Sequence, residues 1–130
     1  MLFSRSVDYA IQALGRLAEA SEGEQVMARV IAEEERLPAF FLAKTLQNLA
    51  RHGLLKSTKG PTGGFSLAKP AAKIRILDVV EALDGLEHLQ SGQEGLPNFK
   101  PIRTSIMSYL KNTTIADVAA LRKRSRRKKS

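Results

Sequence analysis

Cysteine is absent from this 130-residue chain. Its absence excludes disulfides, thiolate metal sites and thiol nucleophiles. Long apolar runs are missing too. A typical apolar run of this chain, residues 38–43, is far too short to cross a bilayer. Arg5 and Asp8 place charge near the N-terminus, where a secretory signal would need an apolar core. We therefore expect a cytoplasmic protein that does not span a membrane.

Acidic side chains are missing from residues 36–75, which carry eight basic residues and no carboxylate. The flanking segments are acidic: residues 1–35 hold three basic and seven acidic side chains, and residues 76–121 hold three basic and six acidic ones. Most of the net charge of +8 comes from a further seven basic residues within 122–130. A basic segment enclosed by acidic ones indicates a surface that binds a polyanion such as a nucleic acid.

Side chains suited to catalysis are few. His88 could ligate a metal together with Asp8 and Glu94, but no ligand spacing specifies such a site. We expect these residues to be solvent-exposed and the protein to hold no metal or cofactor. The glycine-rich residues 60–66 lack the Lys-Ser/Thr ending of a phosphate-binding loop and precede an expected strand. Since no activated nucleophile or acid–base pair is recognisable, we do not expect an enzyme.

Hydrophobic periodicity predicts a mainly α-helical fold with one small β-hairpin. Helices are expected at about residues 7–18 and 27–34, and a third begins at Pro38 and stops before Gly53. A short helix, a brief turn and a longer helix in succession are typical of a helix-turn-helix.

A hairpin and one more helix complete the expected N-terminal domain. Residues 54–58 and 65–67 alternate apolar and polar side chains around a Gly/Pro-rich tip, which predicts a two-stranded wing. A short helix follows at residues 76–83. The sequence therefore predicts a winged helix-turn-helix domain over residues 1–85.

The C-terminal part is expected to hold two further helices. Residues 86–98 are polar and contain glycine, and we predict a loop there. One helix follows Pro101 and another opens at a capping box that begins with Thr114, so that both lie within residues 99–121. The basic residues 122–130 cannot bury themselves, and we expect a disordered tail.

The third helix is expected to enter the major groove of DNA, where base edges present a readable pattern of donors and acceptors. Lys44 can donate to guanine, and Gln47 can pair with adenine. Phe40, near the start of the helix, either contacts a thymine methyl or packs beneath the turn. The other expected contacts, to phosphates or to a minor groove entered by the wing tip, are made by Arg51, Lys56, Lys59, Gly60 and Thr62.

Six segments of the chain resemble one protein family. The most specific is the wing sequence Lys-Gly-Pro-Thr-Gly-Gly-Phe-Ser-Leu at residues 59–67. Together the segments resemble the Rrf2 family of winged helix-turn-helix transcriptional regulators, which includes IscR, NsrR and CymR, over about residues 1–121. The matching segments are residues 6–10, 41–44, 59–67, 77–83, 100–103 and 112–117.

The resemblance implies a homodimeric regulator of transcription, which we expect to be a repressor. The helix at about residues 101–110 would cross to the partner subunit as a dimerisation helix. Two recognition helices and two wings would then meet a pseudo-palindromic operator in double-stranded DNA, because protein and operator share a two-fold axis. The expected dimer contacts are Ile102, Ile106, Tyr109 and Leu110.

This chain departs from the family pattern in its base-reading positions and in its cluster ligands. Phe40 and Ala43 stand where members carry polar residues, so we expect a different operator sequence. Lys59 replaces the commoner arginine at the wing tip. Cluster-binding members place three cysteines within the equivalent of residues 87–100, and this chain has none. Asp8 matches a non-cysteine ligand of some members, but one carboxylate cannot hold an iron–sulfur cluster, so we expect none.

Two other functions remain open from the sequence alone. The chain could be a protein-interaction module that keeps the fold without reading an operator, since Phe40 and Ala43 cannot hydrogen-bond to bases through their side chains. Alternatively, residues 122–130 could make it a nonspecific nucleic-acid binder.

Overall fold

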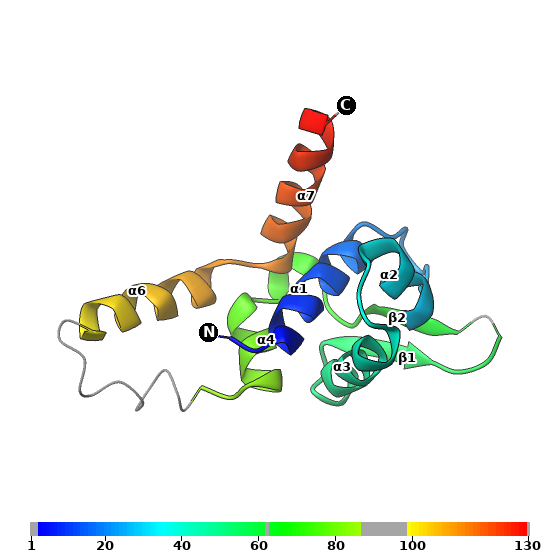
Figure 1. Cartoon of the computed structure of the whole chain (residues 1–130), viewed down its shortest axis with the longest axis horizontal. Helices are drawn as coiled ribbons and strands as arrows, with labels where there is room; N and C mark the ends of the chain where they lie inside the picture. Colours follow the sequence, from blue (N-terminus) through cyan, green and yellow to red (C-terminus); the bar gives the residue numbers. More distant parts are fainter. Residues whose placement is uncertain (1–2, 62, 87–98, 130) are drawn as a thin grey trace.

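The computed structural model of the protein describes residues 3–61, 63–86 and 99–129. Its helices and hairpin follow one another in the expected order (Figure 1), which confirms the mainly α-helical fold with a small hairpin. The expected loop at 86–98 lies outside the described residues, except for Leu86. The elements are α1 Arg5–Ala18, α2 Ala28–Glu35, α3 Ala39–Arg51, β1 Leu55–Thr58, β2 Gly64–Leu67, the 3-10 helix η1 Ala71–Lys73, α4 Ile76–Leu83, α6 Phe99–Asn112 and α7 Ile115–Lys129.

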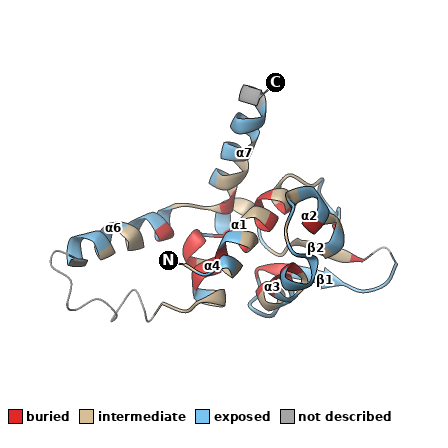
Figure 2. Cartoon of the chain, viewed as in Figure 1, coloured by how far each residue is buried: buried red, intermediate tan, exposed pale blue. Residues whose placement is uncertain are grey.

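α1 is the central element of the core. It contacts α2, α3, α4, α7 and β2, and Figure 2 shows that the buried residues gather in α1 and the helices beside it. Val7, Ala10, Leu14 and Leu17 recur at helical spacing and are all buried. Burial of this stripe holds the other helices around α1, since each buried Leu or Val side chain contributes about 1.5–3 kcal/mol.

α2 and α3 form the helix-turn-helix. α2 ends where Arg36 adopts a left-handed backbone conformation, with φ of 58°, and its N–H donates to the carbonyl of Ala32. Pro38 then caps α3 in an extended conformation that its ring favours. Leu42 and Leu46 of α3 are fully buried against the core. The turn between the two helices is thus present, as the sequence predicted.

The wing is an antiparallel pair of strands whose base is tied to the core. Leu55 pairs with Leu67 and Thr58 pairs with Gly64. Phe65 is buried and exchanges backbone hydrogen bonds of 2.8 and 3.0 Å with Val26, ahead of α2. A Cβ atom on Gly64 would lie 2.7 Å from the Val26 backbone, so only glycine permits this close approach.

The C-terminal helices are anchored to the N-terminal domain by backbone hydrogen bonds. The Ile76 N–H donates to the Thr113 carbonyl and the Ile115 N–H to the Ile74 carbonyl, both at 2.9 Å. Leu110, from the last turn of α6, is buried in the core of the same chain. From this junction α6 and α7 project in different directions (Figure 1).

The structure corrects the expectation of a disordered tail, because α7 continues as a helix to Lys129. The capping box predicted at its start is present: the Thr114 N–H donates to Asp117 at 2.9 Å, and the Asp117 N–H donates to the Thr114 hydroxyl at 3.3 Å. Two arginines of α7, Arg122 and Arg126, have ionic partners in Glu19, which caps α1, and Glu35 of α2.

Arg122 forms the centre of this contact, and we call Arg122, Glu19 and Glu35 the Arg122 clamp. Arg122 donates to both carboxylate oxygens of Glu35 at 2.8 and 3.0 Å and to Glu19 at 3.1 Å. Arg126 also pairs with Glu19. α7 can come this close because a Cβ atom on Gly15 would lie 2.7 Å from Cδ of Arg122. The clamp thus joins the C-terminal helix to α1 and to the first helix of the helix-turn-helix.

The clamp also sets the protonation of its members. Burial alone would raise the pKa of the Glu19 carboxyl, but hydrogen bonds from Arg126 and Arg122 outweigh burial and hold that pKa below its usual range. Hydrogen bonding to Glu35 raises the pKa of Arg122. Both shifts favour the charged forms that make the contact.

Replacing Arg122 by alanine is expected to lower the free energy of unfolding by about 1–3 kcal/mol at neutral pH, because half-buried Glu35 loses its arginine partner and Glu19 keeps Arg126 but loses Arg122. The depressed pKa of Glu19 stabilises the fold above the pKa of the unfolded chain, and this contribution is lost as the pH falls through the folded pKa. The difference in free energy of unfolding between the variant and the wild type should therefore become smaller below about pH 4.5.

Urea unfolding across this pH range measures both effects. Lys123→Ala is the matched control, because Lys123 is exposed on the same helix and should change stability by less than about 0.5 kcal/mol. If Arg122→Ala and Lys123→Ala are equally stable at pH 7, the clamp does not hold α7.

Candidate nucleic-acid interface

One face of α3 carries the side chains that the sequence assigned to DNA. Phe40, Lys44, Gln47 and Arg51 are spaced four, three and four residues apart, and all four are exposed. Their helical spacing places them on one side, while the apolar side chains of α3 are buried on the other side. α3 therefore presents a continuous face of long side chains to solvent.

Phe40 is 77% exposed, so the structure places it on this outer face and not beneath the turn. The Nζ atom of Lys44, one helical turn later, lies over the Phe40 ring at 4.6 Å from its centroid. This distance is typical of a cation–π contact. Arg51, at the far end of the face, lies within 3.5 Å of the Asn48 side chain.

A contact that the sequence did not reveal fixes the start of α3. The ring of Phe41 packs edge-on against Tyr9 of α1, with centroids 5.6 Å apart and planes at 88°. Thr45 donates its hydroxyl hydrogen to the Phe41 carbonyl at 3.0 Å. Because Phe41 is held against α1, the rotation of α3 about its axis is set. No periodic pattern in the sequence distinguishes Phe41 from its neighbour Phe40.

The wing extends beside this face (Figure 1). Lys56, Lys59 and Gly60 are exposed, and Gly60 has a φ of 102°, which suits the glycine that the sequence places there. Thr62, the remaining expected contact, lies outside the described residues. Gln25 donates to the Thr58 hydroxyl at 2.7 Å and so connects the wing to the loop before α2, a contact that the sequence analysis missed.

Three acidic residues of the N-terminal half form ion pairs with arginines of α1 and α7. Glu34 accepts a hydrogen bond from Arg16 at 2.8 Å, and Glu19 and Glu35 belong to the Arg122 clamp. No carboxylate belongs to α3 or to either strand of the wing. The described residues thus separate a basic face from paired acidic side chains on α1 and α2, as binding to a polyanion requires.

Asp8, His88 and Glu94 are the residues that the sequence analysis considered as metal ligands and expected not to bind a metal. Asp8 is exposed on α1, and the other two lie outside the described residues. Among the residues that the structure describes, no group of His, Asp and Glu side chains could hold a metal ion. His52 lies at the end of α3, where its Nδ1 atom is 2.9 Å from the Asn48 carbonyl.

Within the same described ranges, no helix combines the length and apolar character needed to cross a membrane.

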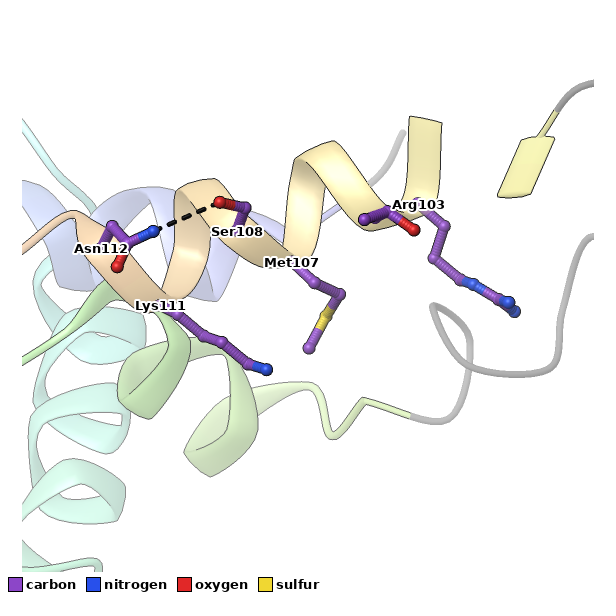
Figure 3. A pocket seen from close by; sticks show the side chains of 6 residues that line it. Arg103, Met107, Ser108, Lys111 and Asn112 are labelled. Carbon is purple, nitrogen blue, oxygen red and sulfur yellow. Dashed lines mark hydrogen bonds between the residues drawn. The ribbon is translucent and has the colours of Figure 1, made fainter. Parts of the chain in front are cut away.

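α6 carries the side chains assigned to a dimer contact. Ile102 and Tyr109 are 54% and 62% exposed, and Ile106 is half-buried. Leu110 is buried in its own chain, so we remove it from the expected dimer contact. A shallow groove of about 370 Å³ runs along another side of α6 (Figure 3). Its lining residues are Arg103, Thr104, Met107, Ser108, Lys111 and Asn112.

Comparison with known proteins identifies the family to which this arrangement belongs. Residues 3–121 match the Rrf2 family, described as iron-dependent transcriptional regulators. The chain belongs to the Rrf2 family. A Mycobacterium tuberculosis (strain ATCC 25618 / H37Rv) protein described as a candidate HTH-type transcriptional regulator is 35% identical over 131 residues, covering 92% of this chain and 81% of the relative.

Two further comparisons agree with this assignment. The HTH-type transcriptional regulator IscR of Yersinia pestis is 29% identical over 121 residues, covering 85% of this chain and 74% of IscR. The structure of CymR, the global cysteine regulator of Bacillus subtilis, superposes with a TM-score of 0.79 at 23% identity, over 92% of this chain and 96% of CymR. The winged helix-turn-helix fold is thereby confirmed, and the Rrf2 family consists of DNA-binding regulators of transcription and not of enzymes.

Lys59→Ala is expected to weaken the binding of this Rrf2 protein to DNA by about 1 kcal/mol and to reduce the slope of log affinity against log salt by about one, because the phosphate contact predicted for Lys59 would be lost. Fluorescence anisotropy at several salt concentrations measures both quantities. Lys59→Arg keeps the charge and should bind as the wild type does. Equal affinities of Lys59→Ala and wild type at every salt concentration would remove Lys59 from the interface.

Proposed function

We propose that this Rrf2 protein is a homodimer that recognises a pseudo-palindromic DNA sequence through α3 and the wing, without an iron–sulfur cluster. The observation that supports it most is the outer face of α3. Phe40, Lys44 and Gln47 stand exposed along a helix whose diameter fits the major groove, and Lys56 and Lys59 extend the basic surface to the wing. In this arrangement residues 1–85 read the DNA and residues 99–121 join the two subunits.

The dimer is supported by the apolar side chains that α6 exposes. Ile102 and Tyr109 lie seven residues apart and so project from the same side of α6, with half-buried Ile106 between them. A second copy of the chain would cover them. A two-fold axis would then place two α3 helices on half-sites about one helical turn of DNA apart.

The residues present do not fit the iron–sulfur cluster that an iron-dependent family implies. Such clusters are held by cysteine thiolates, and this chain contains no cysteine. Asp8 is a single exposed carboxylate. We therefore derive no step of DNA binding from a cluster, and we propose that the polypeptide binds its operator without one.

Selection of genomic DNA fragments by the purified protein, followed by sequencing, tests the proposal. The wild type is expected to enrich one imperfect palindrome. The double variant Ile102→Glu/Tyr109→Glu should sediment as a monomer and lose this enrichment, because charge repels the two α6 helices. Ser108→Glu is the control, since Ser108 is exposed on the grooved side of α6.

The contribution of the basic C-terminal end of α7 to DNA binding is tested with a separate variant in the same selection. Truncation at residue 121 would also remove Arg122 and so disturb the fold, whereas Lys123→Gln/Arg124→Gln neutralises two exposed side chains in place. This variant is expected to enrich the same palindrome with lower affinity. If the wild type retains DNA without any shared sequence, the protein does not read an operator, and a nonspecific or protein-binding function takes its place.

A further inference from the structure

Phe40 is an apolar side chain on a polar and basic face. Among the residues that the structure describes, it is the most exposed large hydrophobic side chain, at 77%. Its neighbour Phe41 is anchored on Tyr9. Successive helical residues point about 100° apart, so the anchoring of Phe41 aims Phe40 outward from α1. The ring therefore projects from α3 with Lys44 over it, in a position where a bound partner could contact it.

The ring stands where a helix-turn-helix meets base edges. Phe40 is the second residue of α3, and the N-terminal residues of a recognition helix contact bases in the major groove. An aromatic ring cannot accept or donate the hydrogen bonds that distinguish most bases. The thymine 5-methyl group is the apolar feature in that groove, and Phe is among the side chains that contact it.

Lys44 shares this location because its ammonium lies over the Phe40 ring, 4.6 Å from the centroid. The two residues are separated by about 6 Å along the helix axis, which is less than two base-pair steps of about 3.4 Å. The ammonium can donate to the O6 and N7 acceptors of guanine. A lysine held over the ring can thus reach a base beside the one that the ring touches.

We propose that Phe40 and Lys44 act as one recognition unit that reads a thymine methyl next to a guanine in each half-site. This inference rests on the proposed function, since it names what α3 recognises. Burial of one methyl group against the ring corresponds to about a fourfold gain in affinity. Deoxyuridine in place of that thymine should remove this gain and leave all base-pairing hydrogen bonds intact.

The test uses the palindrome obtained by genomic selection, with each thymine of a half-site replaced in turn by deoxyuridine. Wild-type protein is expected to lose about fourfold in affinity at one position. Phe40→Ala should bind the thymine and deoxyuridine duplexes equally, and it should fold normally because Phe40 is exposed. Lys59→Ala is the matched control: it should weaken binding to both duplexes by the same factor and keep the methyl effect.

The guanine partner is tested with 7-deazaguanine at the neighbouring positions. Wild-type protein should lose affinity there, and Lys44→Ala should be insensitive to the change. Joint recognition also predicts that Phe40→Ala reduces the 7-deazaguanine effect, because the ring no longer positions the ammonium.

Two results overturn the inference while leaving the proposed function intact. One is specific binding that no deoxyuridine substitution changes, and the other is a methyl effect of equal size in wild type and Phe40→Ala. If the wild type does not distinguish the selected palindrome from a scrambled duplex, the proposed function itself fails and the recognition unit fails with it.

Discussion

Burial of one face of α3 against the core is the constraint on which the DNA-binding surface depends. Leu42, Leu46 and Leu49 are fully buried, and the Tyr9–Phe41 contact fixes the rotation of the helix. The side chains on the opposite face are then presented in a defined register, which a solvent-exposed helix of this length would not maintain by itself. The surface proposed to bind DNA is thus the outer face of α3, whose inner face is packed in the core.

The arrangement of charge follows from the same architecture. Glu34 and Glu35 of α2 and Glu19, at the C-terminal end of α1, are paired with Arg16, Arg122 and Arg126, and these ion pairs partly neutralise the acidic side of the domain. The clamp also links α7 to α2, and therefore the C-terminal helices to the helix-turn-helix. These ion pairs connect the position of α7 directly to α2, the first helix of the helix-turn-helix.

Features set by local sequence patterns were predictable. α4 was expected at residues 76–83 and is found at Ile76–Leu83, and the wing and the capping box of α7 also lie where expected. The outward direction of Lys44, Gln47 and Arg51 followed from periodicity, whereas that of Phe40 required the structure. The helical state of residues 122–129 did not follow from periodicity: the partners of Arg122 and Arg126 in this helix, Glu19 and Glu35, lie about a hundred residues away along the chain. For the same reason the burial of Leu110 and the Tyr9–Phe41 contact required the tertiary structure.

The central claim is that side chains of α3 read bases, and Gln47 lies in the middle of its exposed face. The most direct measurement compares the affinity of wild type and Gln47→Ala for the selected palindrome and for a scrambled duplex at one salt concentration. The account predicts a loss of about 1–3 kcal/mol on the palindrome with unchanged affinity for the scrambled duplex. An equal ratio of the two affinities in both proteins would contradict it.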